Sequence, residues 1–484
     1  MMQKRVLLIN PPTGLMIRED RCQASVNNNP LVMRPPIDLM YVAASLEAHG
    51  FECRLRDYPL LRKSWKDFDS ELREFNPDVL VMSTTISTLV NDLHAASMAK
   101  NYNPDILTIA KGPHFKVEDQ RALRDFPDLD VAVHGESEIP ISECCTKNGL
   151  SEVRGITYRD RSTGNILRTE RPPLLDDLDA LPLPARHLID NSLYVRPDTL
   201  EPQTTIQTAR GCPWSCIYCL SPVVYGSQVR QRSPESLVAE VEHCKTRYGI
   251  QNFIFLADTF TVNKKWVISL CKLLIERNLK VSWACNSRVN TLDEERIQWM
   301  KKAGCWLIAF GTESGNDEHL KLMKKGTTTE FAKPAIDLCR KYGIKSYTYF
   351  IFGLPWETKD SARKTIQFAK WLDADIAEFY TAYPLPGTEL AKMAEEMGLY
   401  EKSALRESHL GAYEPAILRT PELSPQDILR YSTQARMEFY MRPKYIIRKL
   451  TGIRSYNELK AHLTFGYQLL RGVFTVRRRA AMST

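Results

Sequence analysis

The sequence predicts an α/β protein in which an N-terminal doubly wound parallel sheet precedes a partial (β/α)6 barrel and a basic helical C-terminal tail. Two series of short, β-branched or Leu-rich segments alternate with segments of helical periodicity. A proline-spaced stretch separates the two series, and three closely spaced cysteines stand at the start of the second series. We therefore divide the chain into residues 1–150, 151–200, 201–400 and 401–484.

The first series predicts a five-stranded sheet of flavodoxin-like order. Helical segments such as residues 36–49 join the strands by right-handed crossovers, which produce a parallel, doubly wound sheet. Ligands of such sheets bind at the carboxyl ends of the strands. We expect strands at residues 4–10, 51–57, 77–83, 106–112 and 131–134, with Asn10, Pro11, Pro12, Ser83, Thr84, Thr85, Gly112, Pro113, His114, Gly135 and Glu136 at their carboxyl ends.

The middle of the chain predicts a β-hairpin over residues 155–170, followed by an extended linker at Leu181-Pro182-Leu183-Pro184. The second series then predicts six βα units. In barrels of this kind the chemistry lies at the carboxyl ends of the strands. We expect these strands at residues 204–208, 252–257, 281–285, 306–310, 346–352 and 377–382, with helices between them such as residues 234–248 and 264–277.

Cys212, Cys216 and Cys219 follow the first strand of the second series at the spacing C-x3-C-x2-C. Three thiolates on one tight loop can take three corners of a 4Fe-4S cluster and leave the fourth iron open for a substrate. A zinc site would want a fourth ligand nearby, but the next candidate, His243, lies far along the chain. A disulfide is disfavoured because the N-terminus lacks the pattern of a signal peptide. The other nine cysteines are expected to be core thiols.

With an aromatic residue, Tyr218, directly before the last cysteine, this motif resembles that of the radical S-adenosylmethionine (radical SAM) superfamily. The resemblance implies a reduced cluster that cleaves S-adenosylmethionine to methionine and a 5′-deoxyadenosyl radical, with a reductant of the flavodoxin or ferredoxin type. It also implies that groups at successive strand ends hold the amine, carboxylate, ribose and adenine of S-adenosylmethionine. The implied contacts are Tyr218, Asp258 for the amine, Ser287, Arg288 for the carboxylate, Glu313 for the ribose and Gly353 for the adenine.

The layout of residues 4–147, placed before a radical SAM motif, resembles the B12-binding domain of the cobalamin-dependent branch, which includes anaerobic porphyrin cyclases and P-methylases. The D-x-H-x-x-G motif of many such domains is absent after the first strand, where the sequence is Pro-Pro-Thr-Gly. A protein histidine is therefore not expected as the lower cobalt ligand. Two alternatives stay open: His114 faces the corrin or bonds to backbone, and the domain binds cobalamin or has lost its ligand. The implied cobalamin contacts are Asn10, Pro11, Ser83, Thr84, Gly112, His114, Gly135 and Glu136.

The net charge of +7 is concentrated in the tail. From Arg436 to the end there are eleven Lys or Arg and two acidic residues, so the preceding chain is slightly acidic and unsuited to nucleic acid. Residues 439–450 alternate basic with aromatic or aliphatic side chains, and residues 463–474 and 477–479 add apolar and basic segments. This pattern suits either peripheral contact with an anionic membrane or a helical cap on the barrel. No apolar stretch is long enough to span a bilayer, and we expect a cytoplasmic protein.

Together the motifs predict a radical SAM enzyme that uses cobalamin to methylate an unactivated carbon of a small-molecule or lipid-like substrate. The alternatives are a cobalamin-associated cyclase, oxidase or ring-rearranging enzyme, and a methylthiotransferase. A methylthiotransferase needs three further cysteines in the N-terminal domain, and Cys22, Cys53, Cys144 and Cys145 do not have that pattern. The radical needs a dry pocket. Its aromatic lining is expected from among six residues, half of which are equally explained as core side chains: Trp214, Tyr218, Phe260, Phe310, Tyr349 and Phe352.

Overall fold

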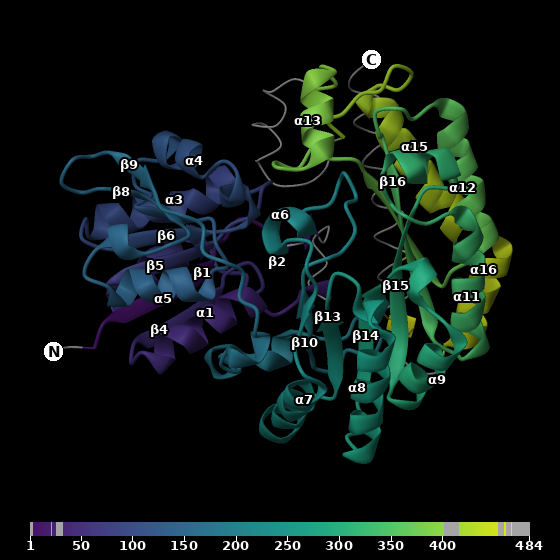
Figure 1. Ribbon diagram of the computed structural model, residues 1–484, viewed down its shortest axis with the longest axis horizontal. Coiled ribbons are helices and arrows are strands. Elements are labelled where there is room, and N and C mark those ends of the chain that lie inside the picture. Colours follow the sequence, from purple (N-terminus) through teal and green to yellow (C-terminus); the bar gives the residue numbers. More distant parts are fainter. Residues whose placement is uncertain are drawn as a thin grey trace.

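The computed structural model describes residues 3–20, 22–25, 32–400, 416–453, 459–460 and 466. Figure 1 shows two α/β units side by side, each built on its own sheet, with helices of the C-terminal region on the outer side of the second unit. The predicted α/β fold class is confirmed. Within the described ranges, no helix is long and apolar enough to cross a membrane.

The first sheet has the strand order β4-β1-β5-β6-β7-β8-β9, and it is parallel from β4 to β7. The parallel part has the predicted flavodoxin-like order. Its strands are apolar on both faces because α1 and α5 cover one face, around Leu8, and α2, α3 and α4 cover the other, around Leu7. The strands are β1 (Arg5–Asn10), β4 (Glu52–Asp57), β5 (Val79–Ser83), β6 (Leu107–Lys111) and β7 (Val131–Val133), and the helices are α1 (Ile37–Ala48), α2 (Trp65–Phe75), α3 (Leu89–Tyr102), α4 (Asp119–Asp125) and α5 (Glu138–Thr146).

Two hairpins extend this architecture beyond the sequence prediction. The hairpin expected within residues 155–170 is present as β8 (Ile156–Arg159) and β9 (Ile166–Arg168), but it pairs antiparallel with β7 and so belongs to the first sheet. A second hairpin, β2 (Met16–Glu19) and β3 (Cys22–Ser25), follows β1. It brings Arg18 against the carboxyl end of β5, where the guanidinium donates to the carbonyl of Ser83 over 2.9 Å.

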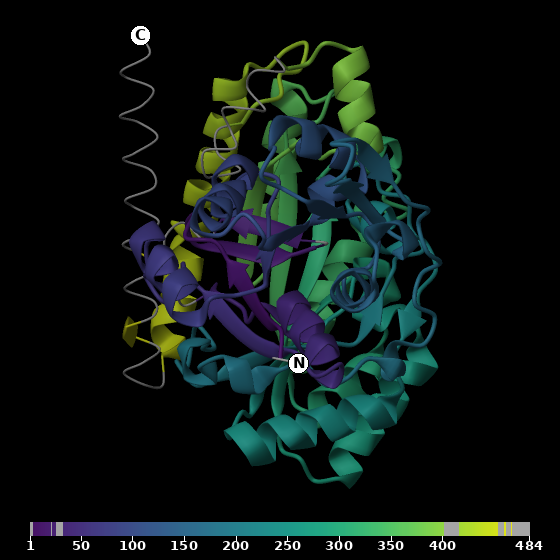
Figure 2. The same ribbon diagram turned by 90° about the vertical axis from the view of Figure 1, so that its left-hand side faces the viewer.

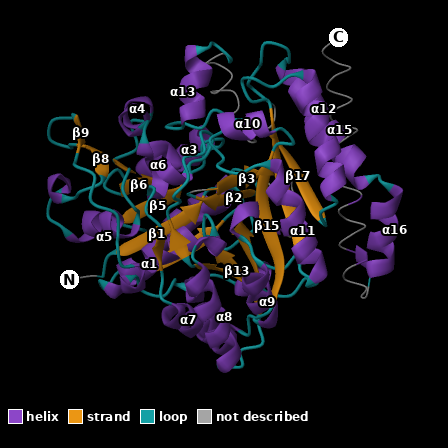
Figure 3. Cartoon of the chain, turned by 45° about the vertical axis from the view of Figure 1, so that its right-hand side comes forward, coloured by secondary structure: helices purple, strands orange, loops and turns teal. Residues whose placement is uncertain are grey.

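The second sheet has six parallel strands in chain order, β10-β13-β14-β15-β16-β17, which is the predicted partial barrel. Outward side chains such as Trp283 and Phe350 are buried against the surrounding helices. Figure 3 shows these helices outside the curved sheet, and Figure 2 views the molecule with the first sheet in front of the barrel. The strands are β10 (Gln203–Gln207), β13 (Asn252–Leu256), β14 (Ser282–Ser287), β15 (Cys305–Glu313), β16 (Lys345–Phe352) and β17 (Ile376–Thr381), and the helices are α6 (Ser221–Tyr225), α7 (Pro234–Tyr248), α8 (Lys264–Glu276), α9 (Glu294–Lys302), α10 (Asp317–Leu322), α11 (Ala332–Lys341), α12 (Lys359–Leu372) and α13 (Glu389–Glu396).

Local sequence signals place the ends of the barrel helices. Helix α7 begins after Ser233, whose side chain accepts a hydrogen bond from the Ser236 N–H, and it ends at Gly249 with a φ of 68°. Helix α12 begins with a capping box between Thr358 and Ser361. These caps hold the helices against the sheet and leave the strand ends to the loops that carry the site.

The described part of the tail forms a helical cap on the barrel. Phe439 of α15 (Pro425–Tyr440) packs edge-on against Phe379 of β17, and Tyr445 of α16 (Pro443–Gly452) is buried beside it. Two basic side chains of this region turn inward, since Arg442 and Arg448 form ion pairs with Asp373 at 3.2 and 2.9 Å, whereas Lys444 is largely exposed. Of the two predicted roles, the cap accounts for Phe439, Tyr440 and Tyr445, whereas Ile447 and Leu450 are exposed. Membrane contact stays a prediction, and residues 463–474 (apart from 466) and 477–479 lie outside the described residues.

Candidate functional site

The three cysteines lie on the loop between β11 (Ala209–Arg210) and α6, beyond the carboxyl end of β10. All three are free thiols and half-buried. Burial raises the pKa of Cys219 to about 12, and the charges of Asp258, Cys216 and Cys212 act in the same direction, so the three sulfurs are near one another. Gly211 opens the loop at a φ of 90°, where any side chain would overlap the carbonyl of Gln228.

The cysteine loop fits an iron–sulfur cluster. In the part of the chain that the structure describes, no three His, Cys, Asp or Glu side chains converge as they would on a single metal ion. A cubane asks for a different geometry, because each cysteine binds a different iron. Three thiolate ligands on one loop are the soft donor set that such clusters prefer.

Tyr218 joins the cysteine loop to the carboxyl end of β15. Its hydroxyl donates to Glu313 Oε1 over 2.9 Å, and Lys325 Nζ donates to the same oxygen over 2.6 Å. Glu313 and Lys325 are both buried, and Glu313 has a φ of 65°, which is unusual for a residue with a side chain. The predicted ribose acid is thus held firmly beside the cluster motif. Lys325 could not be predicted from the sequence, because nothing in the run Lys324-Lys325 separates it from its exposed neighbour.

Arg288, predicted to hold the carboxylate of S-adenosylmethionine, has partners on the cysteine loop. Its guanidinium lies 4.2 Å from the centre of the Trp214 ring and 3.8 Å from Cys216 Sγ. It also donates to the carbonyl oxygen of Lys325. Arg288 therefore stabilises the cysteine loop. If it binds the carboxylate of S-adenosylmethionine, the guanidinium has to contact that group and these partners at the same time.

The two other polar residues predicted for S-adenosylmethionine differ in placement. Asp258 lies near the cysteine loop, as its effect on the thiols shows, and is half-buried. Ser287 is buried, and its hydroxyl lies 2.5 Å from that of Thr261. The structure thus brings Asp258, Arg288 and Glu313 around the cysteines, whereas the Ser287 hydroxyl is bonded into the loop that follows β13.

Gly353 directly follows β16 and has a φ of 89°. A side chain there would meet Ile428 of α15 at 2.8 Å, so helix packing requires this glycine, and contact with adenine stays a prediction. Its N–H donates to the carboxyl group of Glu357, whose pKa is raised to about 8 by burial. The sequence does not single out Glu357, because an acidic residue in a loop is ordinarily solvated.

The residues predicted to contact cobalamin lie along one edge of the first sheet. Asn10, Pro11, Ser83, Thr84, Gly112 and Gly135 are buried, and His114 and Glu136 are half-buried. Much of their hydrogen-bonding capacity is used within the chain; the Thr84 hydroxyl, for example, donates to the carbonyl of Lys111 over 3.0 Å. Asn10 Oδ1, however, is buried and has no partner among the described residues. This acceptor at the end of β1 fits a ligand group that enters the edge.

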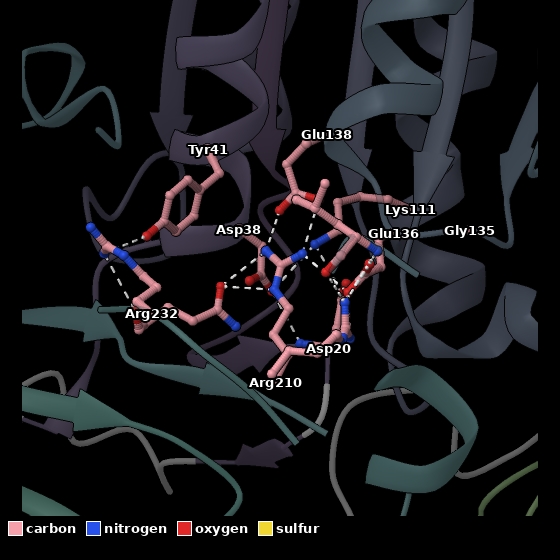
Figure 4. A network of polar contacts seen from close by, with 12 residues as sticks. Asp20, Asp38, Tyr41, Lys111, Gly135, Glu136, Glu138, Arg210 and Arg232 are labelled. Atoms are coloured by element: carbon pink, nitrogen blue, oxygen red, sulfur yellow. Dashed lines mark hydrogen bonds and ion pairs between the residues drawn. The ribbon is translucent and has the colours of Figure 1, made fainter. Parts of the chain in front are cut away.

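A buried network of charges joins this edge to the cysteine loop (Figure 4). Arg210, two residues before Cys212, pairs with Glu136 at 3.2 Å and with Glu138 at 2.5 Å. Arg230 also contacts Glu136, at 3.0 Å. The two predicted cofactor sites therefore share one boundary, built from Glu136 and Glu138 on one side and the cysteine motif on the other.

Known proteins match both halves of this arrangement. Residues 206–369 match the family model of the radical SAM superfamily, and residues 29–144 match that of the B12 binding domain. An uncharacterized methyltransferase of Pyrococcus horikoshii is 30% identical over 451 residues, which cover 92% of this chain and 94% of that protein. The chain belongs to the B12-binding radical SAM family.

Two further comparisons place this B12-binding radical SAM protein. The anaerobic magnesium-protoporphyrin IX monomethyl ester cyclase of Rubrivivax gelatinosus is 28% identical over 370 residues, which cover 74% of this chain and 65% of the cyclase. The fold matches that of the cobalamin-dependent S-adenosylmethionine radical enzyme OxsB, solved with aqua-cobalamin and S-adenosylmethionine bound, with a TM-score of 0.72 and 17% identity over 96% of this chain and 71% of that one. The likeness to OxsB covers nearly the whole chain and therefore spans the two predicted cofactor regions.

Family membership assigns the cofactors that the motifs predict. The chain is a radical SAM enzyme, and its cofactors are a 4Fe-4S cluster, S-adenosylmethionine and cobalamin. The cysteine loop and the edge of the first sheet are the parts of the structure that fit them. The individual contacts to S-adenosylmethionine and cobalamin stay predictions.

The aromatic lining expected for this B12-binding radical SAM site is only partly present. Phe260, Phe310 and Phe352 are fully buried between the sheet and the outer helices, so these three are core side chains. Trp214 and Tyr218 are half-buried on the cysteine loop, and Tyr349 is half-buried on the opposite face of β16 from Phe352. Successive side chains of a strand point to opposite faces of the sheet. A shift of one residue along the strand therefore moves a side chain from the core to the face of the site.

Proposed function

We propose that the protein methylates an unactivated carbon atom of a small-molecule or lipid-like substrate. When bound, the cluster supplies the electron that cleaves S-adenosylmethionine, and cobalamin supplies the methyl group. The observation that carries the proposal is the ion pair of Arg210 with Glu136 and Glu138, which joins the cysteine motif directly to the cobalamin edge. Two cofactor sites with a common boundary favour a reaction in which both act on one substrate.

The residues around the cysteines support binding and orientation more than proton transfer. Glu313 is held by Tyr218 and Lys325, and Arg288 is braced against the loop. Fixed polar groups of this kind orient a cosubstrate without cost at the moment of reaction. A reductant of the flavodoxin or ferredoxin type would supply the electron.

The inner face of the second sheet favours a substrate with an apolar or ring-shaped part. Tyr347 and Tyr349 of β16 have ring centres 4.7 Å apart, and Tyr380 of β17 follows at 6.0 Å from Tyr349. Leu307 and Ala309 lie on the same face. Aromatic side chains with polar hydroxyl groups bind flat apolar molecules and still offer hydrogen bonds at the edge.

Product analysis tests the proposal. The protein, purified anaerobically with cobalamin and reduced, is given S-adenosylmethionine and candidate substrates. Methylation consumes two molecules of S-adenosylmethionine, one leaving methionine and 5′-deoxyadenosine and the other leaving S-adenosylhomocysteine. Substrate-dependent deoxyadenosine without S-adenosylhomocysteine would contradict methyl transfer and favour a cyclase-like outcome, the activity named for the Rubrivivax relative.

A further inference from the structure

Helix α16 differs between its two sides. Tyr445 is buried against the barrel, and its hydroxyl donates to the carbonyl of Asp375 over 2.9 Å. Away from this contact the helix carries Ile446, Ile447 and Leu450, which are 37, 61 and 63% exposed. A helix packed on a core normally turns its apolar side chains inward and its polar ones to solvent. α16 therefore has an apolar stripe that its role as a barrel cap does not use.

The stripe is continuous on the surface of the helix. Leu450 follows Ile446 by four residues and Ile447 by three, so the three side chains are neighbours on one face. Met441, in the turn directly before α16, is also 49% exposed. In the described ranges, no other helix exposes more than one large apolar side chain between its ends. Single exposed apolar residues are ordinary, but a contiguous group marks a surface that contacts something other than water.

The surroundings of the stripe are basic. Arg442, Lys444 and Arg448 share the single carboxylate of Asp373, at 3.2, 3.3 and 2.9 Å, so this corner keeps a net positive charge. The Lys444 side chain is 82% exposed, and it precedes the stripe by less than one helical turn. The sequence from residue 439 to residue 457 contains five Lys or Arg and no acidic residue. An apolar stripe thus lies within a positively charged surface.

These two properties together favour a membrane that contains anionic lipids. Basic side chains at such a surface are attracted to the head groups, while apolar side chains enter the boundary with the acyl chains. Nucleic acid would match the charge but would not bury an aliphatic stripe. A second copy of the chain would bring two positively charged faces together.

We infer that the outer face of α16, formed by Lys444, Ile446, Ile447 and Leu450, is a docking surface for an anionic lipid bilayer. Figure 1 shows α16 on the outer side of the barrel. Arg448 donates to the carbonyl of Ala374, before the amino end of β17, whereas the cysteines follow the carboxyl end of β10. Docking there leaves the predicted cofactor sites clear. The surface localises the protein, and the inference does not depend on methyl transfer or on the substrate.

Sedimentation of the reconstituted protein with lipid vesicles tests the inference. The unaltered protein should bind vesicles of phosphatidylcholine mixed with phosphatidylglycerol, and salt should weaken this binding. Ile447→Ser combined with Leu450→Ser should weaken it by about tenfold or more, since two apolar side chains no longer enter the bilayer. The matched control combines Leu167→Ser with Ile275→Ser, which removes two exposed apolar side chains elsewhere, and should bind as the unaltered protein does.

Charge reversal tests the electrostatic part of the docking. Lys444→Glu should weaken binding to the phosphatidylglycerol vesicles by about tenfold, because a basic contact becomes a repulsive one. Lys265→Glu, at an exposed position in the first turn of α8, is the control and should leave binding unchanged. All four variants replace surface residues, so their circular dichroism spectra should match that of the unaltered protein.

Equal vesicle binding by the Ile447→Ser, Leu450→Ser variant and the unaltered protein would overturn the inference, because another part of the chain would then hold the membrane. Binding that is the same without phosphatidylglycerol, or no binding to either kind of vesicle, would also overturn it. Self-association of the unaltered protein that the double variant loses would assign the face to a second copy instead. Normal vesicle binding with no methylated product would count against the proposed function alone.

Discussion

The carboxyl edges of the two parallel sheets obey the same rule of ligand placement but differ in how accessible their charged and ligand side chains are. At the first edge, charges are paired inside the protein: Arg18 with Asp92 at 2.9 Å, and Lys111 with Asp20 at 2.9 Å, all nearly inaccessible. The second edge also has a buried ion pair, Glu313 with Lys325 at 2.6 Å, but its three cysteines stay half-exposed on their loop. We call the first edge, where the charged side chains are inaccessible, the closed edge, and the second, where the cysteines are accessible, the open edge. The ion pairs of Arg210 lie between them.

This difference has a physical consequence for each cofactor. The open edge needs only its ligand atoms to bind a cluster, so loss of one ligand removes function and leaves the fold. The closed edge is held by buried ions, which are costly to separate. A ligand that enters there has to replace contacts that stabilise the fold. Binding of cobalamin and stability of the fold are therefore coupled at that edge.

Replacing one cluster ligand gives the largest expected effect on activity. Cys216→Ala removes a thiolate at the open edge and should abolish 5′-deoxyadenosine formation, while the unfolding midpoint changes little. Cys53→Ala is the matched control, because Cys53 is also half-buried but lies on β4. Deoxyadenosine release and iron content, measured anaerobically, check the outcome. Turnover in Cys216→Ala equal to that of the control would refute the cluster assignment.

Breaking a buried ion pair at the closed edge should give the largest effect on stability. Arg18→Met leaves Asp92, which is fully buried, without its cation, and should lower the free energy of unfolding by about 3–5 kcal/mol. Urea unfolding followed by circular dichroism measures this change. Arg73→Met, which breaks the exposed pair with Asp69, serves as control and should cost under about 1 kcal/mol. Equal losses in the two variants would contradict the view that buried charges close this edge.

The same replacement bears on cobalamin. If the Arg18 pair closes the edge, Arg18→Met should alter the rate at which the folded protein takes up cobalamin, followed by its visible absorbance. The Arg73→Met control should take up cobalamin at the unaltered rate. An unchanged rate in Arg18→Met would place cobalamin entry elsewhere along the edge.

Glu357, which accepts a hydrogen bond from the Gly353 N–H, should make the free energy of unfolding depend on pH, an effect of intermediate size. Burial raises the pKa of Glu357 to about 8, so the folded protein holds the carboxyl group neutral while the unfolded chain ionises it. The free energy of unfolding is therefore highest at low pH, where the carboxyl group is neutral in both states. It falls by about 1.4 kcal/mol for each pH unit as the pH rises toward about 8. Glu357→Gln should therefore gain about 2 kcal/mol on the unaltered protein between about pH 6 and about pH 7.5. A difference that is constant with pH would refute the assignment.

The sequence predicts the strands well because each parallel strand is buried on both faces and appears as a short apolar run. It predicts the cysteine loop because three thiolates at one spacing have few other uses. It does not predict Lys325, Glu357 or Arg18, since each is a common surface residue whose burial depends on a partner distant in the chain. Glu313 lies between these cases: its place at a strand end was predictable, but its contacts with Tyr218 and Lys325 were not.

The smallest expected effect lies at the opposite end of the barrel. Asp373, just before β17, is partly buried, which opposes its ionisation, but Arg448, Arg442 and Lys444 hold its pKa below the usual range. Asp373→Asn should loosen α16 and lower the free energy of unfolding by about 1 kcal/mol, because Arg448 is partly exposed and Lys444 is largely exposed, so water can solvate these charges. Asp337→Asn, in an exposed pair with Arg340, is the control. Binding of S-adenosylmethionine should not change in either variant, because strand amino ends support the fold while carboxyl ends carry the chemistry. A loss of binding in Asp373→Asn would show that the cap also shapes the open edge.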